Sequence, residues 1–166
     1  MKKFTVEHAF DCDPDTLWLT FFDEAFTKAQ FASFGFPSFE IVSQKDEGDR
    51  VVRTMRVTPK LEVPGAVAKL LGSSFAYTEE GTFDKAAKVW TWKTTTSVLP
   101  NKIHSHGTVR VLPAGAGKCI QKSEFEISVD VFGVGGAIES ALEKNFTNGW
   151  NNGATFTRRW LAGARS

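Results

Sequence analysis

Tyrosine, cysteine, methionine and histidine are all scarce in this chain: its 166 residues include one, two, two and three of them, respectively. The two cysteines, Cys12 and Cys119, lie far apart and in no motif, which predicts two buried, reduced thiols of a cytosolic protein. The chain also has no GxSxG, Cys–His signature, Walker loop or HExxH. A hydrolase or a kinase is therefore not supported.

Long apolar runs and excess charge are missing as well. Nothing approaches the roughly 18 apolar residues of a membrane-spanning helix, and no apolar core follows the basic start of the chain as it would in a signal peptide. The formal net charge of +1 gives no overall attraction to nucleic acid or to an acidic membrane surface. We therefore expect a cytoplasmic protein with one domain, residues 1–166, that has neither a nucleic-acid nor an integral-membrane partner. The oligomeric state stays open.

Phenylalanine and tryptophan, in contrast, are plentiful, with fifteen and five copies against the single tyrosine. Most of these rings have no polar group that would favour a place at the surface. Their number predicts either a broad apolar interior or a cavity walled by aromatic side chains.

Hydrophobic periodicity predicts an α+β fold. FTVEHAF (4–10) alternates as a strand, and Asp13 and Pro14 then begin one helix, or two short ones, that ends near Gly35. Antiparallel hairpins follow, with turns at KDEGD, DKAAK and PAGAG, and a long helix starts near residues 134–138. Since a sheet with one apolar face needs a cover, we expect a curved antiparallel sheet of about seven strands wrapped around this terminal helix.

The first hairpin carries a charged residue on an apparently inward face. Ser43 is expected to share the face of Ile41 on one strand, and Arg53 lies between Val51 and Met55 on the other. A buried arginine needs an anion or a carboxylate partner. Arg53 could bind the acid group of a ligand or pair with a protein carboxylate, or the parity could slip at the sheet edge.

VPGAVAKLLG (63–72) interrupts the strand pattern with a short apolar helix after Pro64. It could be a lid at a cavity mouth, with Gly65 and Gly72 as hinges. It could equally be a short helix that closes one end of the core.

Trp90 and Trp92 share one face of a strand, and Thr94 and Thr96 continue that face. Two indoles followed by hydroxyls suit an amphipathic ligand, because rings provide contact area and hydroxyls provide orientation. The same residues could simply fill the core, since threonine is a good strand former.

The C-terminal helix, GGAIESALEKNFTNGWNNGATFTRRWL (135–161), contains Gly149 and Gly153 on one face. Each glycine costs a helix interior roughly 0.5–1 kcal/mol relative to alanine. Small residues there either let another element come close or leave space for a ligand. The neighbouring asparagines could cap a kink, line a wet cavity or face solvent.

Two other patterns suggest chemistry but fit the surface better. His104 and His106 lie on the same side of a strand whose opposite side is apolar, so we expect them to face solvent and expect no metal site. Glu124 and Glu126 alternate with apolar residues and are expected to face outward. Glu79 and Glu80 could be a carboxylate pair for acid–base work. No catalytic residue and no cofactor is predicted.

The order strand, helix pair, curved antiparallel sheet and long closing helix resembles the START-like superfamily, also known as SRPBCC or helix-grip proteins. MRVTPKLEVPGAVAKLLG (55–72), FAYTEEGTF (75–83), FGVGGAIES (132–140) and the terminal RRWL (158–161) resemble a poorly characterised bacterial family within it. The superfamily includes birch-pollen-allergen proteins, polyketide cyclases and lipid-transfer domains. The resemblance implies a cavity between helix and sheet, usually for an apolar ligand, and no shared catalytic signature.

These observations together favour a non-enzymatic domain that binds or carries a small hydrophobic or amphipathic ligand, lipid-like or polyketide-like. An enzyme of the cyclase or aromatase type is one alternative. A protein-interaction module like a co-chaperone, with a collapsed cavity, is the other. The residues expected to line the cavity are Phe22, Phe26, Arg53, Met55, Trp90, Trp92, Phe146, Trp150 and Gly153.

Overall fold

The computed structural model describes residues 1–163 and contains one seven-stranded antiparallel sheet in the order β1-β7-β6-β5-β4-β3-β2. Four helices accompany it in this part of the chain. The elements are β1 (Lys2–Phe10), α1 (Pro14–Phe21), α2 (Glu24–Ser33), β2 (Ser38–Asp46), β3 (Arg50–Thr58), α3 (Gly65–Leu71), β4 (Tyr77–Asp84), β5 (Val89–Thr96), β6 (Ile103–Pro113), β7 (Cys119–Val129) and α4 (Gly135–Leu161).

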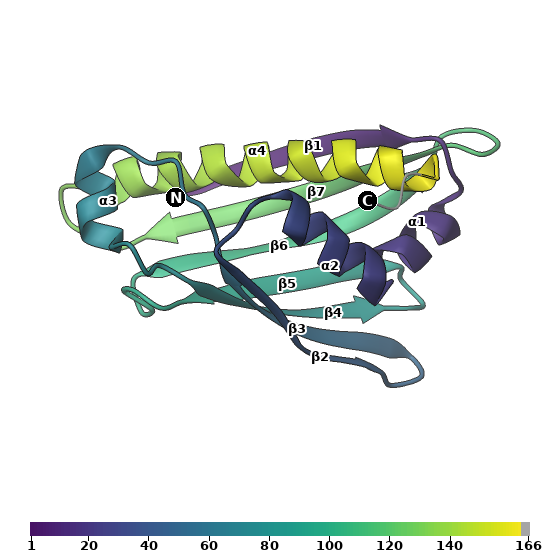
Figure 1. Cartoon of the computed structure of the whole chain (residues 1–166), viewed down its shortest axis with the longest axis horizontal. Helices are drawn as coiled ribbons and strands as arrows, with labels where there is room; N and C mark the ends of the chain where they lie inside the picture. The colour runs from purple at the N-terminus through teal and green to yellow at the C-terminus, as the bar shows by residue number, and fades with distance from the viewer. Residues whose placement is uncertain (164–166) are drawn as a thin grey trace.

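The sheet curves around α4, which runs along β1 and β7, while α1 and α2 lie on the same side of the sheet and α3 stands at one end (Figure 1). Ile138 of α4 is fully buried in a core cluster with Ile103 and Ile127 of the sheet. The predicted helix-grip arrangement is confirmed. No helix within residues 1–163 has the length and apolar character needed to cross a membrane.

The helical region after β1 consists of two helices, because the chain makes a new N-terminus at Asp23. The Asp23 carboxylate accepts hydrogen bonds from the amides of Ala25 (2.9 Å) and Phe26 (3.4 Å), two donors that the start of a helix leaves free. Pro14 begins α1, where its missing N–H and fixed φ cost nothing. After this break between α1 and α2, helix α2 packs against α4.

A β-bulge at Val42 corrects the expected face of Ser43. The pairing of β2 with β3 shifts between Ile41 and Ser43, so that Ser43 lies opposite Thr54 and Gln44 lies opposite Arg53. The extra residue moves every later side chain of β2 to the other face of the sheet. Gln44 therefore takes the inward place.

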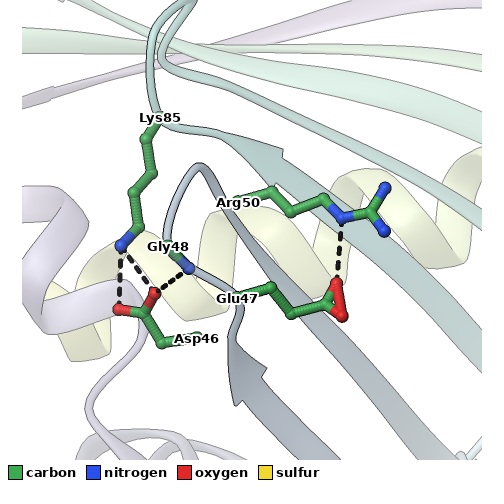
Figure 2. Close-up of polar contacts among 5 residues, drawn as sticks. All are labelled: Asp46, Glu47, Gly48, Arg50 and Lys85. Carbon is green, nitrogen blue, oxygen red and sulfur yellow. Dashed lines mark hydrogen bonds and ion pairs between the residues drawn. The ribbon is translucent and has the colours of Figure 1, made fainter.

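The turn between β2 and β3 is held by its own acidic residues (Figure 2). Asp46 accepts a hydrogen bond from the Gly48 amide (3.0 Å) and binds Lys85, after β4, through both carboxylate oxygens (2.7 and 2.8 Å). Gly48 has a φ of 92°, which favours glycine. Glu47 and Arg50 form a second ion pair across the turn (2.9 Å). The contact from Lys85 ties the end of this hairpin to the next one.

The helix α3 closes one end of the core. Val67 and Leu71 are buried against the first turns of α4, and Gly72 ends the helix with a φ of 77°. This arrangement favours the second interpretation of residues 63–72, a core-closing helix, over a hinged lid.

The two cysteines meet in the fold although they are distant in sequence. Cys119 is buried, Cys12 is only partly buried, and both are free thiols in the same apolar cluster. Burial raises the pKa of the Cys119 thiol to about 12, so it is protonated at neutral pH.

Glu139 anchors the start of α4 to the sheet. Its carboxylate accepts hydrogen bonds from the N-terminal ammonium group of Met1 and the amide of Val129, each at 2.9 Å. These donors lower the pKa of Glu139 below its ordinary value of 4.5. A lowered pKa stabilises the folded state above the pKa of the unfolded chain, and this contribution is lost as pH falls through the folded value.

We therefore expect Glu139→Gln to reduce the free energy of unfolding by about 1–2 kcal/mol at neutral pH, and the deficit to shrink below pH 4.5. Urea denaturation at neutral and acid pH measures both values. Glu143→Gln, which removes a half-exposed ion pair with Lys2, is the control and should have little effect. An equal deficit at both pH values for Glu139→Gln would contradict the assignment.

Candidate ligand-binding cavity

A cavity of about 710 Å³ lies between the inner face of the sheet and the helices α2 and α4. Strands β3 to β6 provide its floor, and the segment 59–62, after β3, borders it from the side. Small-molecule sites in proteins have volumes of about 300–1,000 Å³ and mostly apolar walls. This cavity is of that size.

Eight of the nine residues predicted to line a cavity do line it. Their role in ligand binding remains a prediction. The eight are Phe26, Arg53, Met55, Trp90, Trp92, Phe146, Trp150 and Gly153.

Phe22 is the ninth, and it lies outside the lining. It packs behind the wall against Phe83 and Trp90, with ring centroids 5.2 and 5.6 Å apart. Its neighbour Phe21 lines the cavity instead. Phe21 is the last residue of α1, and Phe22 is its C-cap. Helical periodicity does not continue past this point, so it could not show which of the two rings faces the cavity.

Arg53 is buried, with 4% of its surface exposed, as the alternation of β3 predicts. Its guanidinium lies 4.7 Å from the ring centroid of Phe21 and 4.9 Å from that of Trp90. Nη1 donates to the carbonyl of Phe21 (3.1 Å), and Nε is buried without an acceptor. Burial lowers the pKa of Arg53 to about 10, which still leaves it charged at neutral pH.

Glu79 is a charged residue of the cavity that the sequence analysis considered only as half of a carboxylate pair and did not place in the lining. It is half-buried on β4, opposite Met55, and lines the cavity together with Tyr77 of the same strand. No ion pair or hydrogen bond joins its carboxylate to another described residue. Burial raises the pKa of Glu79, and the charge of Arg53 partly offsets that rise.

The signal for Glu79 is present in the sequence. Alternation along β4 places Glu79 on the same face as Gly81 and the buried Phe83, whereas Glu80 is exposed. The two glutamates are therefore no carboxylate pair, because they lie on opposite faces of the sheet.

The hydroxyl groups of β5 line the cavity but already have partners. Thr94 bonds to Ser105 of β6, and the Thr96 hydroxyl donates to the carbonyl of Val98 (2.8 Å). Trp90 and Trp92 are almost fully buried and also line the cavity. Their contact with a ligand stays a prediction.

The two glycines of α4 have different surroundings. A Cβ on Gly153 would lie 3.3 Å from Nε2 of Gln30 in α2, whereas a Cβ on Gly149 would meet nothing within 4 Å. One turn before Gly149, the Asn145 side chain pairs with the backbone of Glu62 through two hydrogen bonds (2.9 and 3.1 Å). Gly149 therefore sits between the contact of α4 with segment 59–62 and its contact with α2. We assign this gap as the mouth of the cavity.

Gly149→Ala is expected to stabilise the protein by about 0.5–1 kcal/mol, because alanine is the better helix former and its methyl group has room. Thermal unfolding measures the gain. Gly153→Ala provides the comparison, since its methyl group would press on Gln30 and offset the same helical gain. Equal gains for both variants would contradict the different packing.

None of the three histidines lines the cavity, although His8 contacts Asn151, which does. His104 and His106 are exposed on the outer face, with His106 3.8 Å from Glu126. His8 is buried on β1, where Nε2 bonds to Oδ1 of Asn151 (2.8 Å). Residues 1–163 contain no cluster of three potential metal ligands.

Residues 5–161 match the model of the family described as "Protein of unknown function (DUF2505)". The chain belongs to this family. The comparison of this DUF2505 protein with curated proteins gave no match.

Solved structures similar to this DUF2505 protein come from bacteria and a plant. The protein TTHA0849 from Thermus thermophilus is 14% identical, with a TM-score of 0.66 over 98% of this chain and 100% of the other. Zhui aromatase/cyclase from Streptomyces sp. R1128 is 17% identical, with a TM-score of 0.62 over 98% and 99%. Norcoclaurine synthase from Thalictrum flavum is 18% identical, with a TM-score of 0.64 over 98% and 87%.

At these identities the likeness establishes the fold and leaves the activity open. The DUF2505 protein has the START-like, helix-grip fold, as the sequence resemblance predicted.

Proposed function

We propose that this protein binds a small hydrophobic or amphipathic molecule in the cavity between the sheet and α4. The observation that carries the proposal is a hollow of about 710 Å³ that persists in a chain rich in large rings. Aromatic side chains of α1, β5 and α4 border it, so an apolar ligand would be surrounded by rings. Burial of apolar ligand surface provides about 25 cal/mol per Å², which favours a ligand with a large apolar body.

An enzyme of the cyclase or aromatase type is the second candidate, and Glu79 favours it. An unpaired carboxyl group with a raised pKa inside an apolar cavity suits proton transfer. The fold is shared with an aromatase/cyclase and with norcoclaurine synthase. A protein-interaction module with a collapsed cavity fits less well, because the space between sheet and helices is open.

Native mass spectrometry of the freshly purified protein tests the binding proposal. We expect a population heavier than the bare chain by the mass of one small molecule, and extraction with organic solvent should release that molecule. If the protein carries no molecule and also binds neither pyrenebutyric acid nor its alcohol and amine counterparts, the proposal is wrong. Conversion of the released molecule during incubation with fresh protein would favour the enzymatic candidate.

A further inference from the structure

We propose that Arg53 and Glu79 form a head-group site for a carboxylic acid, so that the ligand has an apolar body and one carboxyl group. This inference rests on the proposed function, which it narrows to one class of ligand. It follows from two charged side chains that line the same cavity without touching each other.

The guanidinium of Arg53 has more donors than acceptors around it. Arginine carries five N–H donors, and one hydrogen bond, to the carbonyl of Phe21, is formed within the described chain. The rings of Phe21 and Trp90 stack on the group and exclude water from it. A carboxylate is the partner that satisfies an arginine fork best, through two parallel hydrogen bonds.

Glu79 lies beside this group but does not provide that partner. Arg53 pairs with Gly81 across the strands, so Glu79 is its diagonal neighbour. Diagonal neighbours are about 7–8 Å apart, and no ion pair joins the two side chains. The donors of Arg53 therefore stay free for the head group of a ligand, and both side chains border the cavity that would hold it.

The other groups around the cavity add little charge. Its remaining ionisable residues are Tyr77, beside Glu79, and Lys60 and Glu62 in the segment after β3. Strands β5 and β6 and helix α4 contribute only uncharged side chains to the lining. The charge balance at the head group is therefore set by Arg53 and Glu79.

A bound carboxylate requires Glu79 to be neutral. Two carboxylates on one arginine repel each other, so one proton from the solvent moves to Glu79, which then donates a hydrogen bond to the ligand. Burial already favours the protonated form of Glu79. An amine would meet the positive charge of Arg53, and an alcohol would lack the charge-assisted bonds.

Three fluorescent probes with one apolar body test the head group: pyrenebutyric acid, pyrenebutanol and pyrenebutylamine. Energy transfer from the tryptophans of the cavity to pyrene reports binding. We expect the acid to bind about tenfold or more tightly than the alcohol, and the amine to bind most weakly. Calorimetry in buffers of different ionisation enthalpy, repeated over a range of pH, should show proton uptake with the acid that rises toward one proton above the pKa of Glu79 in the free protein, and none with the alcohol.

Two variants test the contributions of Arg53 and Glu79 separately. Arg53→Met keeps an apolar stem and should bring the ratio of acid to alcohol affinity close to one. Glu79→Gln resembles the neutral glutamic acid and should remove both the proton uptake and the dependence of acid affinity on pH. Circular dichroism checks that both variants fold.

The comparison of the three probes on the unaltered protein does not depend on any variant. Equal affinities for acid and alcohol would overturn the head-group site and leave the binding proposal intact. Acid binding without proton uptake at any pH in the range would overturn the role of Glu79. If none of the three probes binds and the purified protein carries no molecule, both proposals fall together.

Discussion

Gly149→Trp is expected to weaken binding of pyrenebutanol at least tenfold while the fold stays intact. Gly149 faces the gap between segment 59–62 and α2, and no atom lies within 4 Å of the position of its Cβ. We expect an indole that starts from this open position to occupy the mouth. The helix also gains, because tryptophan is a better helix former than glycine.

Pyrene fluorescence titration and thermal unfolding measure the two effects separately. We expect a loss of affinity of at least tenfold, about 1.4 kcal/mol, with a melting temperature no lower than that of the unaltered protein. Thr155→Trp places the same ring on an exposed position of α4 away from the cavity and is the matched control. Unchanged binding by Gly149→Trp would show that the ligand enters or sits elsewhere.

Gly107→Ala is expected to be the most destabilising of the small substitutions, with a loss of about 3 kcal/mol. A Cβ at this position of β6 would lie 2.1 Å from the carbonyl oxygen of Glu124 and 2.8 Å from the ring of Trp92. The carbonyl belongs to the backbone of β7, so the conflict can be relieved only by separating paired strands.

Chemical denaturation of Gly107→Ala measures this loss, and Gly136→Ala is the control. Gly136 lies at the start of α4 with open space around its Cβ position, so alanine there should be neutral or slightly stabilising. Gly81→Ala tests a softer conflict, because its Cβ would meet the ring of Trp90 at 2.0 Å rather than a backbone atom. A loss at Gly107 no larger than at Gly136 would contradict the close packing of β6.

These substitutions also distinguish glycines that look alike in the sequence. A Cβ on Gly107 would collide with the neighbouring strand, one on Gly153 would press on α2, and one on Gly149 would meet no side chain or neighbouring element within 4 Å. A glycine that weakens a helix although a side chain would have room is consistent with a place where another molecule passes.

The head-group proposal links the cavity to pH. If Glu79 takes up a proton when a carboxylic acid binds, the affinity for the acid falls as pH rises above the pKa of Glu79 in the free protein. Binding of the alcohol should not change over the same range. A carrier with such a site would release an acid more readily in a more alkaline medium.

Periodicity along single segments was sufficient for the order of the elements, the inward place of Arg53 and eight of the residues that line the cavity. These features depend on which residues share one face of a strand or helix, and the alternation of apolar and polar residues encodes that directly. The same alternation puts Glu79 on the face of β4 that carries the buried Phe83.

Only the tertiary structure decided the rest. The bulge at Val42 places Gln44 instead of Ser43 on the inner face of the sheet. At the end of α1, Phe21 lines the cavity and Phe22 does not. The positions of α2 and segment 59–62 give Gly149 and Gly153 different neighbours. Each of these depends on how far one element stands from another, which is set by the packing of side chains distant in sequence. The open cavity is the most important feature that the sequence did not determine. A pattern of apolar residues shows which faces of the sheet and helices point toward each other, but not whether their side chains pack in contact.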